Sequence, residues 1–438
     1  MGRPDQRRTA VPSGRDRRVP AGTTGVVPPD RDPPTGPGGG RLTVAGLGLR
    51  LPGVTHPGHL VGRFGGASAP APAVRRFDAP GSDLEPVERP AWGPVEPRIP
   101  ATVAGRGLRA LPYESLLALA AAAAARDAMV AGGPSGPDVV PTRARPPATT
   151  ATAAGHPVTV APASRPRPDD GPVAVLWASS TAGLTEYATV CVEAATLSPG
   201  LCSPMLGPAS AFNGPAATVS IRLGLDGPNE TLTGDTTAGL AALAEAGRLI
   251  AEGSAAAALV GGSATVSRWS LAGGAGDADG AGCLALRPCR DGEPGVRLGR
   301  ILRLGLDPTD LVTQVRDLVR SRPAPSTLPD GPLVVSARDV DLVDALAADH
   351  ARPVWHLERV LGDLGAAGGL FAAICAVAHC VHTPSPARLL VLAVEPCGNA
   401  AIMEVSTWEA STLSSGCWAD TSPSGEVTAP RTSTPTVS

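Results

Sequence analysis

Short apolar runs and helical segments alternate along the chain from residue 173 onwards, and this alternation restricts the fold more than any other feature. Six runs are typical of strands: 173–180, 256–266, 282–289, 295–306, 331–337 and 387–396. Three segments have a helical pattern: 216–225, 238–252 and 364–381. Strands that alternate with helices favour a layered α/β fold, in which helices cover a mostly parallel sheet.

Before residue 173 the pattern is less dense. Residues 41–53 join a β-type apolar run to a Gly-rich turn, and residues 111–133 predict a buried, Ala-rich helix that ends at a Gly pair. Residues 134–172 are rich in Pro, Thr, Ala and Arg without periodicity, which predicts a low-complexity surface insertion. We predict disordered tails at residues 1–40 and 409–438, because their composition offers few large apolar side chains.

The composition argues against several classes of function. All 37 basic residues are arginine, so no reaction here can use a lysine amine, and the net charge of −3 argues against nucleic acid as a partner. The eight cysteines contain no C-x-x-C pair, which argues against a disulfide scaffold. Arg7 and Arg8 precede no apolar signal segment, and no apolar run fits a membrane span better than a core helix. We therefore expect a cytoplasmic protein without a membrane partner.

The stretch LTGDTTAGLAALAEAGRLIAEG, residues 232–253, predicts a sharp turn followed by a helix. Turns of this kind often present a nucleophile at the helix N-terminus, where the helix dipole favours an anion. The apex here consists of Asp235, Thr236 and Thr237, without a cysteine or serine. A threonine hydroxyl ionises far above neutral pH and needs an adjacent base to attack. The turn is therefore a site with different chemistry or a site whose chemistry has been removed.

Five stretches, in this order, resemble the thiolase-fold β-ketoacyl synthases, the condensing enzymes of fatty-acid and polyketide synthesis. They are PMLGPASAFNGPAATVSIRLGLDGPNETLT, LVGGSATV, GAGCLAL, LGDLGAAGG and VEPCGNAAIMEV. The resemblance covers residues 41–408 without the insertion and is densest over 173–285. It implies a duplicated, thiolase-like α-β-α-β-α fold, with an N-terminal half at 41–285 and a C-terminal half at 286–408.

The family's condensing chemistry uses a cysteine, two histidines and a lysine. Carried over residue by residue, the cysteine position is Thr236 and the first histidine position is Arg338. The second histidine position is Gly362, or Asp363 if a gap is allowed, and the lysine position is near Leu357. Because none of these four positions carries the family's residue, the resemblance implies that the usual condensation does not occur.

The stretch TTAGLAALAEAGRLI also resembles the polyketide chain-length factors, although Thr236 stands where those proteins have a glutamine. This resemblance implies a non-condensing partner subunit that pairs with an active ketosynthase, or with itself, and works with an acyl carrier protein and no cofactor. Two alternatives stay open. One is an acyltransferase or hydrolase that acts on carrier-protein thioesters through Thr236 or Thr237, with Asp235 as a weak base. The other is a structural or binding protein without activity, so whether the chain is an enzyme is undecided.

Cysteines and histidines near the C-terminus add candidate residues. Cys397 and Gly398 match the family's Gly-rich strand, so they join Asp235 and Thr237 as candidate pocket residues, with Cys397 as a structural cysteine. Within 375–382, three ligand-type side chains share one helix face: Cys375, His379 and His382. The segment is otherwise apolar, which favours ordinary helix packing, and we predict no metal site.

Overall fold

Two groups of strands with the same pairing pattern organise the chain. The computed structural model describes residues 42–54, 56–66, 71–78, 84–103, 105, 107–131, 171–290, 293–321, 330–383 and 386–408. The predicted tails at 1–40 and 409–438, and the predicted insertion except residues 171 and 172, lie outside these residues.

The N-terminal strand group has the order β5-β4-β6-β7-β1. Its strands are β1 (Leu42–Arg50), β4 (Val173–Ala178), β5 (Asn229–Leu232), β6 (Ala257–Ala264) and β7 (Gly280–Pro288). Strand β4 pairs in parallel with β5 and β6, whereas β7 pairs antiparallel with β6 and β1. Its main helices are α2 (Tyr113–Val130), α5 (Gly214–Leu223) and α6 (Thr237–Ala251).

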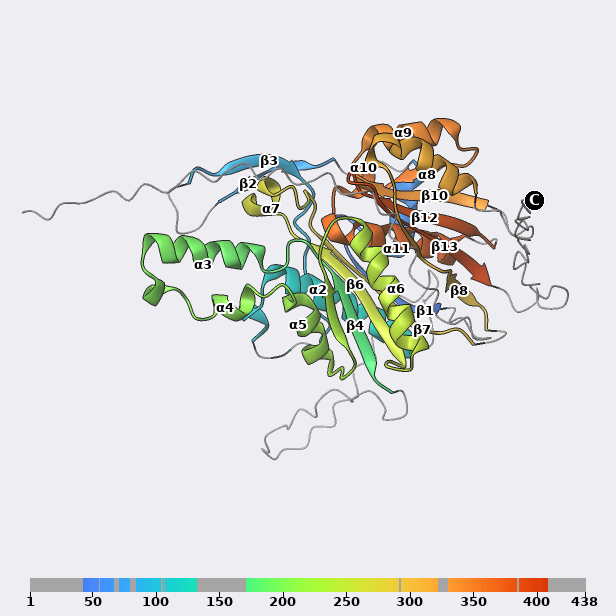
Figure 1. Ribbon diagram of the computed structural model, residues 1–438. Helices are drawn as coiled ribbons and strands as arrows, with labels where there is room; N and C mark the ends of the chain where they lie inside the picture. Colours follow the sequence, from blue (N-terminus) through green and yellow to red (C-terminus); the bar gives the residue numbers. More distant parts are fainter. Residues whose placement is uncertain are drawn as a thin grey trace, which may run out of the picture. The chain divides into compact units, whose positions relative to one another are not determined.

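The C-terminal strand group repeats this pattern in the order β11-β10-β12-β13-β8 (Figure 1). Its strands are β8 (Gly295–Leu298), β9 (Leu302–Gly305), β10 (Asp330–Ala337), β11 (Val354–His356), β12 (Arg388–Val394) and β13 (Asn399–Trp408). Strand β10 pairs in parallel with β11 and β12, and β13 pairs antiparallel with β12, β8 and β9. Its helices α8 (Leu311–Arg320), α9 (Val340–Asp349) and α11 (Gly368–His382) occupy the places of α2, α5 and α6 in chain order.

The repeated pattern confirms the duplicated, layered α/β fold. Parallel pairing, which the sequence predicts for most of the sheet, is found among three strands of each group, and the other pairings are antiparallel. Antiparallel strands need no crossover helix, and the connection between β12 and β13 is correspondingly short. Strands β1 and β8 also pair, which joins the groups into one 11-stranded sheet.

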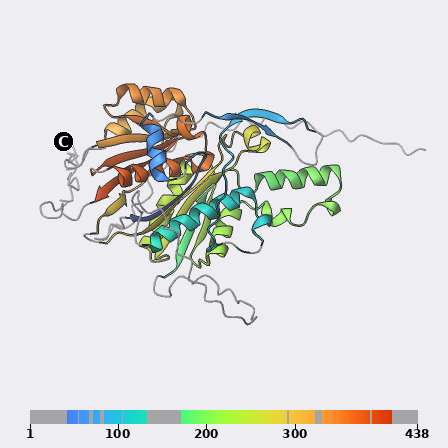
Figure 2. The same cartoon turned by 180° about the vertical axis from the view of Figure 1, so that it is seen from behind.

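Three apolar clusters define the layers, and both views of the ribbon show helices on either side of each strand group (Figures 1 and 2). The inner cluster contains α6 and α11, which pack against each other between the groups. One outer cluster lies beneath α2 and α5, and the other beneath α8 and α9. The Gly365–His382 segment is long and apolar enough to cross a membrane, but 83% of it is buried inside the structure, as in a core helix.

Small residues let these layers approach closely. The Ala-rich helix α2 lies so near β1 that a Cβ at Gly46 or Gly48 would come within 2.0 Å of a carbonyl oxygen of α2. At the inner crossing, a Cβ at Gly239 would lie 2.3 Å from the Leu370 backbone nitrogen. A core poor in aromatic residues therefore fills its volume through close backbone approach.

Several elements differ from the sequence predictions or were not predicted. The single strand predicted at 295–306 is two strands, β8 and β9, which both pair with β13 but in registers that differ by one residue. The helix predicted at 364–381 begins with the 3-10 turn Gly365–Ala367. The unpredicted elements are β5, β11, α8 and α9, together with α1 (Pro57–Phe64), the hairpin β2 (Ala73–Phe77) and β3 (Val87–Ala91), α3 (Leu184–Thr196), α4 (Leu206–Ala209), α7 (Arg268–Ala272), α10 (Leu357–Leu361), and the 3-10 turns Leu108–Ala110, Pro199–Leu201 and Pro308–Asp310.

Candidate functional site

The threonine at the predicted nucleophile position is buried at the N-terminus of α6. Thr236 is only 4% exposed, and its Oγ1 lies 2.5 Å from Ser336 Oγ near the end of β10. Ser336 Oγ donates to Glu358 Oε1 over 2.6 Å. Because Ser336 has one hydroxyl proton, Thr236 donates to Ser336 in turn. The hydroxyl proton of Thr236 therefore points along a series of hydrogen bonds that ends at the Glu358 carboxylate.

Glu358, in the first turn of α10, anchors this chain. Its Oε2 accepts from the backbone N–H of Ala337 over 3.2 Å and lies 3.1 Å from His356 Nε2. The same imidazole nitrogen is 2.8 Å from Ala337 O, and His356 is 5% exposed. Sequence reasoning missed Ser336 and Glu358. A polar residue inside the apolar run LVVSA was the only local signal.

Arg338 lies between two carboxylates, one from each half of the chain. Its Nη2 is 3.2 Å from Asp235 Oδ1, and its Nε is 2.7 Å from Asp363 Oδ2. Burial raises the pKa of both Asp235 and Asp363, and the Arg338 guanidinium partly offsets that rise. The structure thus brings together the predicted positions 236, 338 and 363, with Arg338 engaged in ion pairs.

Gly362 has no room for a side chain. Its φ is +81°, and a Cβ there would lie 2.1 Å from Cδ1 of the Trp92 ring. Trp92 is held in place by backbone hydrogen bonds with Asp277 and Asp279. The backbone N–H of Asp363 donates to Asp277 Oδ1 over 2.7 Å, which ties the same loop to this turn. The Trp92 indole therefore fills the volume that a side chain at position 362 would enter.

The remaining candidate pocket residues meet at Glu395. The backbone N–H and the hydroxyl of Thr237 both donate to Glu395 Oε1, and the thiol of Cys397 is 3.4 Å from Oε2. Burial raises the pKa of Glu395, but hydrogen bonds from Thr237, Asn399 and Cys397 outweigh burial and hold the pKa below its usual range. Gly398, with φ at +95°, closes the turn by donating its N–H to Glu395 O.

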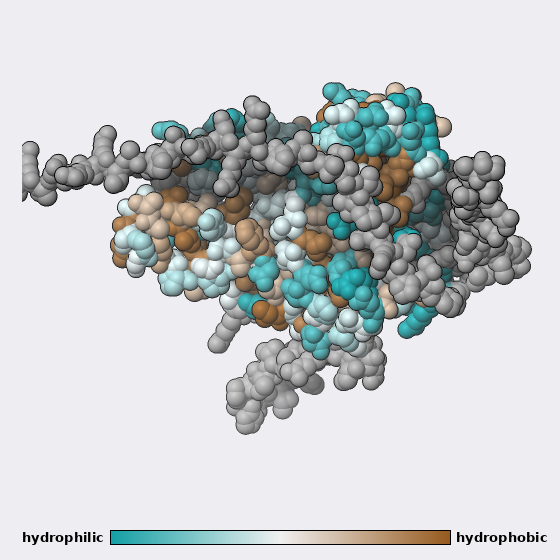
Figure 3. Space-filling view, in the orientation of Figure 1, coloured by the Kyte–Doolittle hydropathy of each residue, from teal (hydrophilic) through white to brown (hydrophobic). Residues whose placement is uncertain are grey.

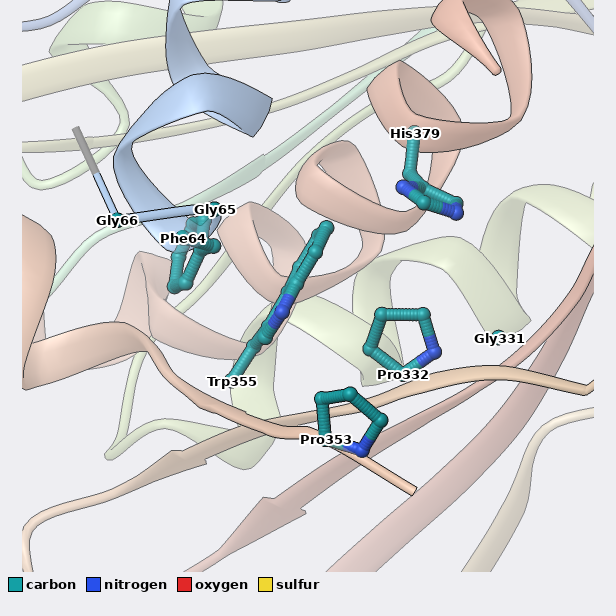
Figure 4. Close-up of a pocket in the computed structure, with 8 residues that line it drawn as sticks. All are labelled: Phe64, Gly65, Gly66, Gly331, Pro332, Pro353, Trp355 and His379. Atoms are coloured by element: carbon teal, nitrogen blue, oxygen red, sulfur yellow. The ribbon is translucent and has the colours of Figure 1, made fainter. Parts of the chain in front are cut away.

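A cavity of about 650 Å³ lies near the start of β10, away from Arg338 at the strand's other end (Figure 4). Its lining includes Phe64 and Trp355, whose stacked rings are 4.8 Å apart, and His379, which meets the indole edge-on. Cys375 and Cys380 of the same helix are buried, and burial raises the pKa of both thiols. Among the described residues, no group of three His, Cys, Asp or Glu side chains could hold a metal ion.

Comparison with protein families gives one match. Residues 154–289 match the model of the β-ketoacyl synthase N-terminal domain. No curated protein matches the chain. The matched segment contains β4 to β7 and the Thr236 turn. It therefore includes the part of the site that lies in the N-terminal half of the chain.

Solved structures with a similar fold match 84% of the chain. The ishigamide ketosynthase/chain length factor is 19% identical, with a TM-score of 0.59 over 99% of its chain. A type II polyketide synthase acyl-carrier protein in complex with its ketosynthase bound to the hexaketide is 12% identical, with a TM-score of 0.56 over 100% of the matched chain. A β-ketoacyl synthase from Burkholderia phymatum STM815 gives the same identity, TM-score and coverage. The TM-scores, all above 0.5, establish the shared fold.

Proposed function

We propose that this chain, a ketosynthase-like protein with the thiolase fold, is a non-condensing partner subunit of an active ketosynthase, in the manner of a chain-length factor. In this proposal both subunits act in the cytoplasm. An acyl carrier protein supplies the acyl group that the active subunit extends. The fold places the chain among ketosynthase-like proteins, so the residues of the site carry the argument about its role.

The packing around Gly362 is the observation that carries the proposal. Decarboxylation and charge stabilisation in a condensing site need groups that exchange or donate protons near neutral pH, such as imidazoles. At position 362, the Trp92 ring occupies the space of such a group. At position 338, the side chain is a guanidinium, which has only hydrogen-bond donors and is paired with Asp235 and Asp363. Thr236 supplies no thiolate, which argues against acyl capture by the usual route.

An apolar arm formed by residues 184–212 supports the partner role. Five large apolar side chains of this arm are more than half exposed: Tyr187, Leu197, Leu201, Met205 and Phe212. Helix α3 has no buried residue, although an isolated helix of its length is marginal in water. Figure 3 shows apolar residues gathered over α3 and α4. Contiguous exposed patches of this kind mark protein-protein contacts.

Association tests this proposal. The chain is co-expressed with candidate cysteine-bearing ketosynthases, and the complex is measured by affinity co-purification and light scattering. Tyr187→Glu together with Phe212→Glu should weaken association at least tenfold, because each places a charge in an apolar contact. Val130→Glu is the matched control, since Val130 is 78% exposed at the end of α2, outside the arm. Absence of a complex with any such ketosynthase would contradict the proposal.

The hydroxyl chain from Thr236 to Glu358 favours one second candidate, acyl transfer from a carrier-protein thioester. Thr236 Oγ1 would attack the thioester carbonyl while its proton passes through Ser336 to Glu358. The carbon–sulfur bond would break, and the departing thiol would take up that proton.

Mass spectrometry separates the two candidates. An acyl enzyme gains the mass of the acyl group when incubated with an acyl thioester, and it loses that gain in Thr236→Ala and Glu358→Gln. Thr237→Ala controls for acylation at the neighbouring hydroxyl. A partner subunit gains no acyl mass.

A further inference from the structure

The cavity of about 650 Å³ near the start of β10 has no role in the proposed function. It lies between the end of α1, the starts of β10 and β11, and α11 (Figure 4). Its volume is within the range of about 300–1,000 Å³ that is typical of small-molecule sites. The cavity is at the amino ends of the parallel strands, whereas Arg338 and the Thr236 turn are at their carboxyl ends, so the two places are separate.

Planar rings form most of the cavity wall. Phe64 and Trp355 stack with their ring centroids 4.8 Å apart and their planes 14° apart, and His379 meets the indole edge-on. Pro332 and Pro353 add two more apolar rings beside the indole (Figure 4). Aromatic rings bind other planar rings by offset stacking and by edge-on contact. These walls therefore favour a planar ligand over a flexible chain.

Two polar groups on the wall have no partner within the described part of the chain. The Trp355 indole N–H donates no hydrogen bond, and neither ring nitrogen of His379 takes part in one. The indole N–H can only donate, whereas a neutral imidazole donates from one nitrogen and accepts at the other. A hydroxyl group both donates and accepts, so it suits either of these partners.

The cavity wall carries no permanent charge. The described lining residues include no Asp, Glu or Arg, and His379 is the only one that titrates near neutral pH. Burial lowers the pKa of His379, so the neutral imidazole predominates at pH 7. An ionic ligand would lose hydration in this cavity without gaining a counter-charge, which favours an uncharged ligand.

Glycines keep the α1 side of the cavity open. A Cβ at Gly66 would have no atom within 4 Å, and a Cβ at Gly65 would lie 3.6 Å from its nearest neighbour, Gly62 O. Gly65 has a φ of −81°, which residues with side chains can adopt. A larger side chain at position 65 would therefore take up cavity volume without requiring a left-handed backbone.

We propose that this cavity binds an uncharged, planar aromatic molecule that carries a hydroxyl group. The rings of Phe64 and Trp355 supply the stacking surface, and the indole N–H and the His379 imidazole bond to the hydroxyl. The proposal does not depend on the function proposed for the chain, because no residue of the Thr236 turn lines the cavity.

Isothermal titration of the full chain at pH 7 tests this site with three probes of one ring system: 2-naphthol, naphthalene and 2-naphthalenesulfonate. One 2-naphthol should bind per chain, more than about tenfold more tightly than the sulfonate, which brings an unpaired charge. His379→Leu should weaken the binding of 2-naphthol about fivefold and leave that of naphthalene unchanged, because naphthalene has no hydroxyl group to bond.

A variant that fills the cavity gives an independent test. Gly65→Leu should weaken the binding of 2-naphthol more than about tenfold, because its side chain competes for the cavity. Gly62→Leu is the matched control, since Gly62 is exposed on the same helix and outside the lining. If Gly65→Leu does not fold, the comparison of 2-naphthol with naphthalene in His379→Leu decides. Equal affinity for 2-naphthol and the sulfonate, or equal effects of the Gly62 and Gly65 variants, would overturn the proposal.

Discussion

Gly362 shows how one residue can decide what a site does. Position 362 is the second histidine position of the ketosynthase resemblance, and the Trp92 ring lies where its Cβ would be. Restoring an imidazole there would require both the indole and the backbone to move. The packing around position 362 therefore excludes an imidazole there.

A Gly362→Ala variant measures that constraint. A non-glycine residue at positive φ costs about 1–3 kcal/mol, and overpacking costs about 1–3 kcal/mol more, so we expect about 2–6 kcal/mol of destabilisation in urea unfolding. Trp92→Ala in the same background should recover part of the overpacking cost. Gly62→Ala is the control, because Gly62 lies in α1 with nothing within 4 Å of its added Cβ. Equal effects at positions 62 and 362 would show that the indole does not restrict the site.

Glu114 is a buried carboxylate whose ionisation opposes folding. Burial raises its pKa, although hydrogen bonds from four hydroxyl groups, including Ser179 and Ser263, act in the opposite direction. A raised carboxyl pKa contributes stability that is present below the unfolded pKa, near 4.3, and is lost as the pH rises through the folded value.

The pH dependence of Glu114→Gln tests this. The free energy of unfolding of the native chain relative to the Gln variant should fall as the pH rises from 4 towards 8. Glu88→Gln on the hairpin strand β3 is the control, because that side chain is exposed. Parallel curves for the native chain and Glu114→Gln would refute the assignment.

At the scale of elements, the N-terminus of α1 meets the C-terminus of α11 through a cluster of histidines. The rings of His56 and His59 are 3.7 Å apart, and those of His56 and His382 are 6.4 Å apart. Desolvation lowers the pKa of His56 and His382, and the neighbouring imidazole lowers each further. The other basic groups on these helices are Arg63 of α1 and His379 of α11. Neither helix contains an acidic residue that could offset the positive charge of a protonated histidine.

Acid should therefore loosen the contact between α1 and α11. A lowered histidine pKa contributes stability that is present above the unfolded value, near 6.5, and is lost as the pH falls towards the folded value. After correction for intrinsic rates, amide protons of α1 should exchange faster at pH 5 than at pH 7. His382→Asn should reduce this difference, whereas His350→Asn at the end of α9 should leave it unchanged. An equal response in both variants would place the pH effect elsewhere.

At the scale of the whole molecule, the two strand groups share one inner core, which predicts that they unfold together. Leu370 of α11 is fully buried in this core and packs against Gly239 of α6. Leu370→Ala should destabilise the chain by about 2–5 kcal/mol. The loss should appear equally in the hydrogen exchange of β4 and β12. Val340→Ala, at a 44% exposed position on α9, should have little effect. Separate transitions for the two groups would show that the inner core does not couple them.

The sequence by itself was sufficient for the features that depend on neighbouring residues. Alternating apolar runs located most of the main strands, and the motif around Thr236 placed its turn at the start of a helix. The ketosynthase-like order of motifs also predicted that positions 236, 338 and 362, or 363, take the places of the family's catalytic residues; in the structure Arg338 forms ion pairs with Asp235 and Asp363. Periodicity and turn chemistry report local burial, so these features could be predicted from the chain alone.

Only the tertiary structure decided what surrounds those positions. The Trp92 ring beside Gly362, Glu358 at the end of the hydroxyl chain and the four hydroxyl groups around Glu114 come from distant parts of the chain. The same holds for the antiparallel pairing of β7 and β13 and for the break between β8 and β9. These contacts depend on how closely the layers pack, and small residues in α2, α6 and α11 set that distance. The local pattern of apolar residues predicts that a residue is buried. The packing of the layers determines which side chain that residue contacts.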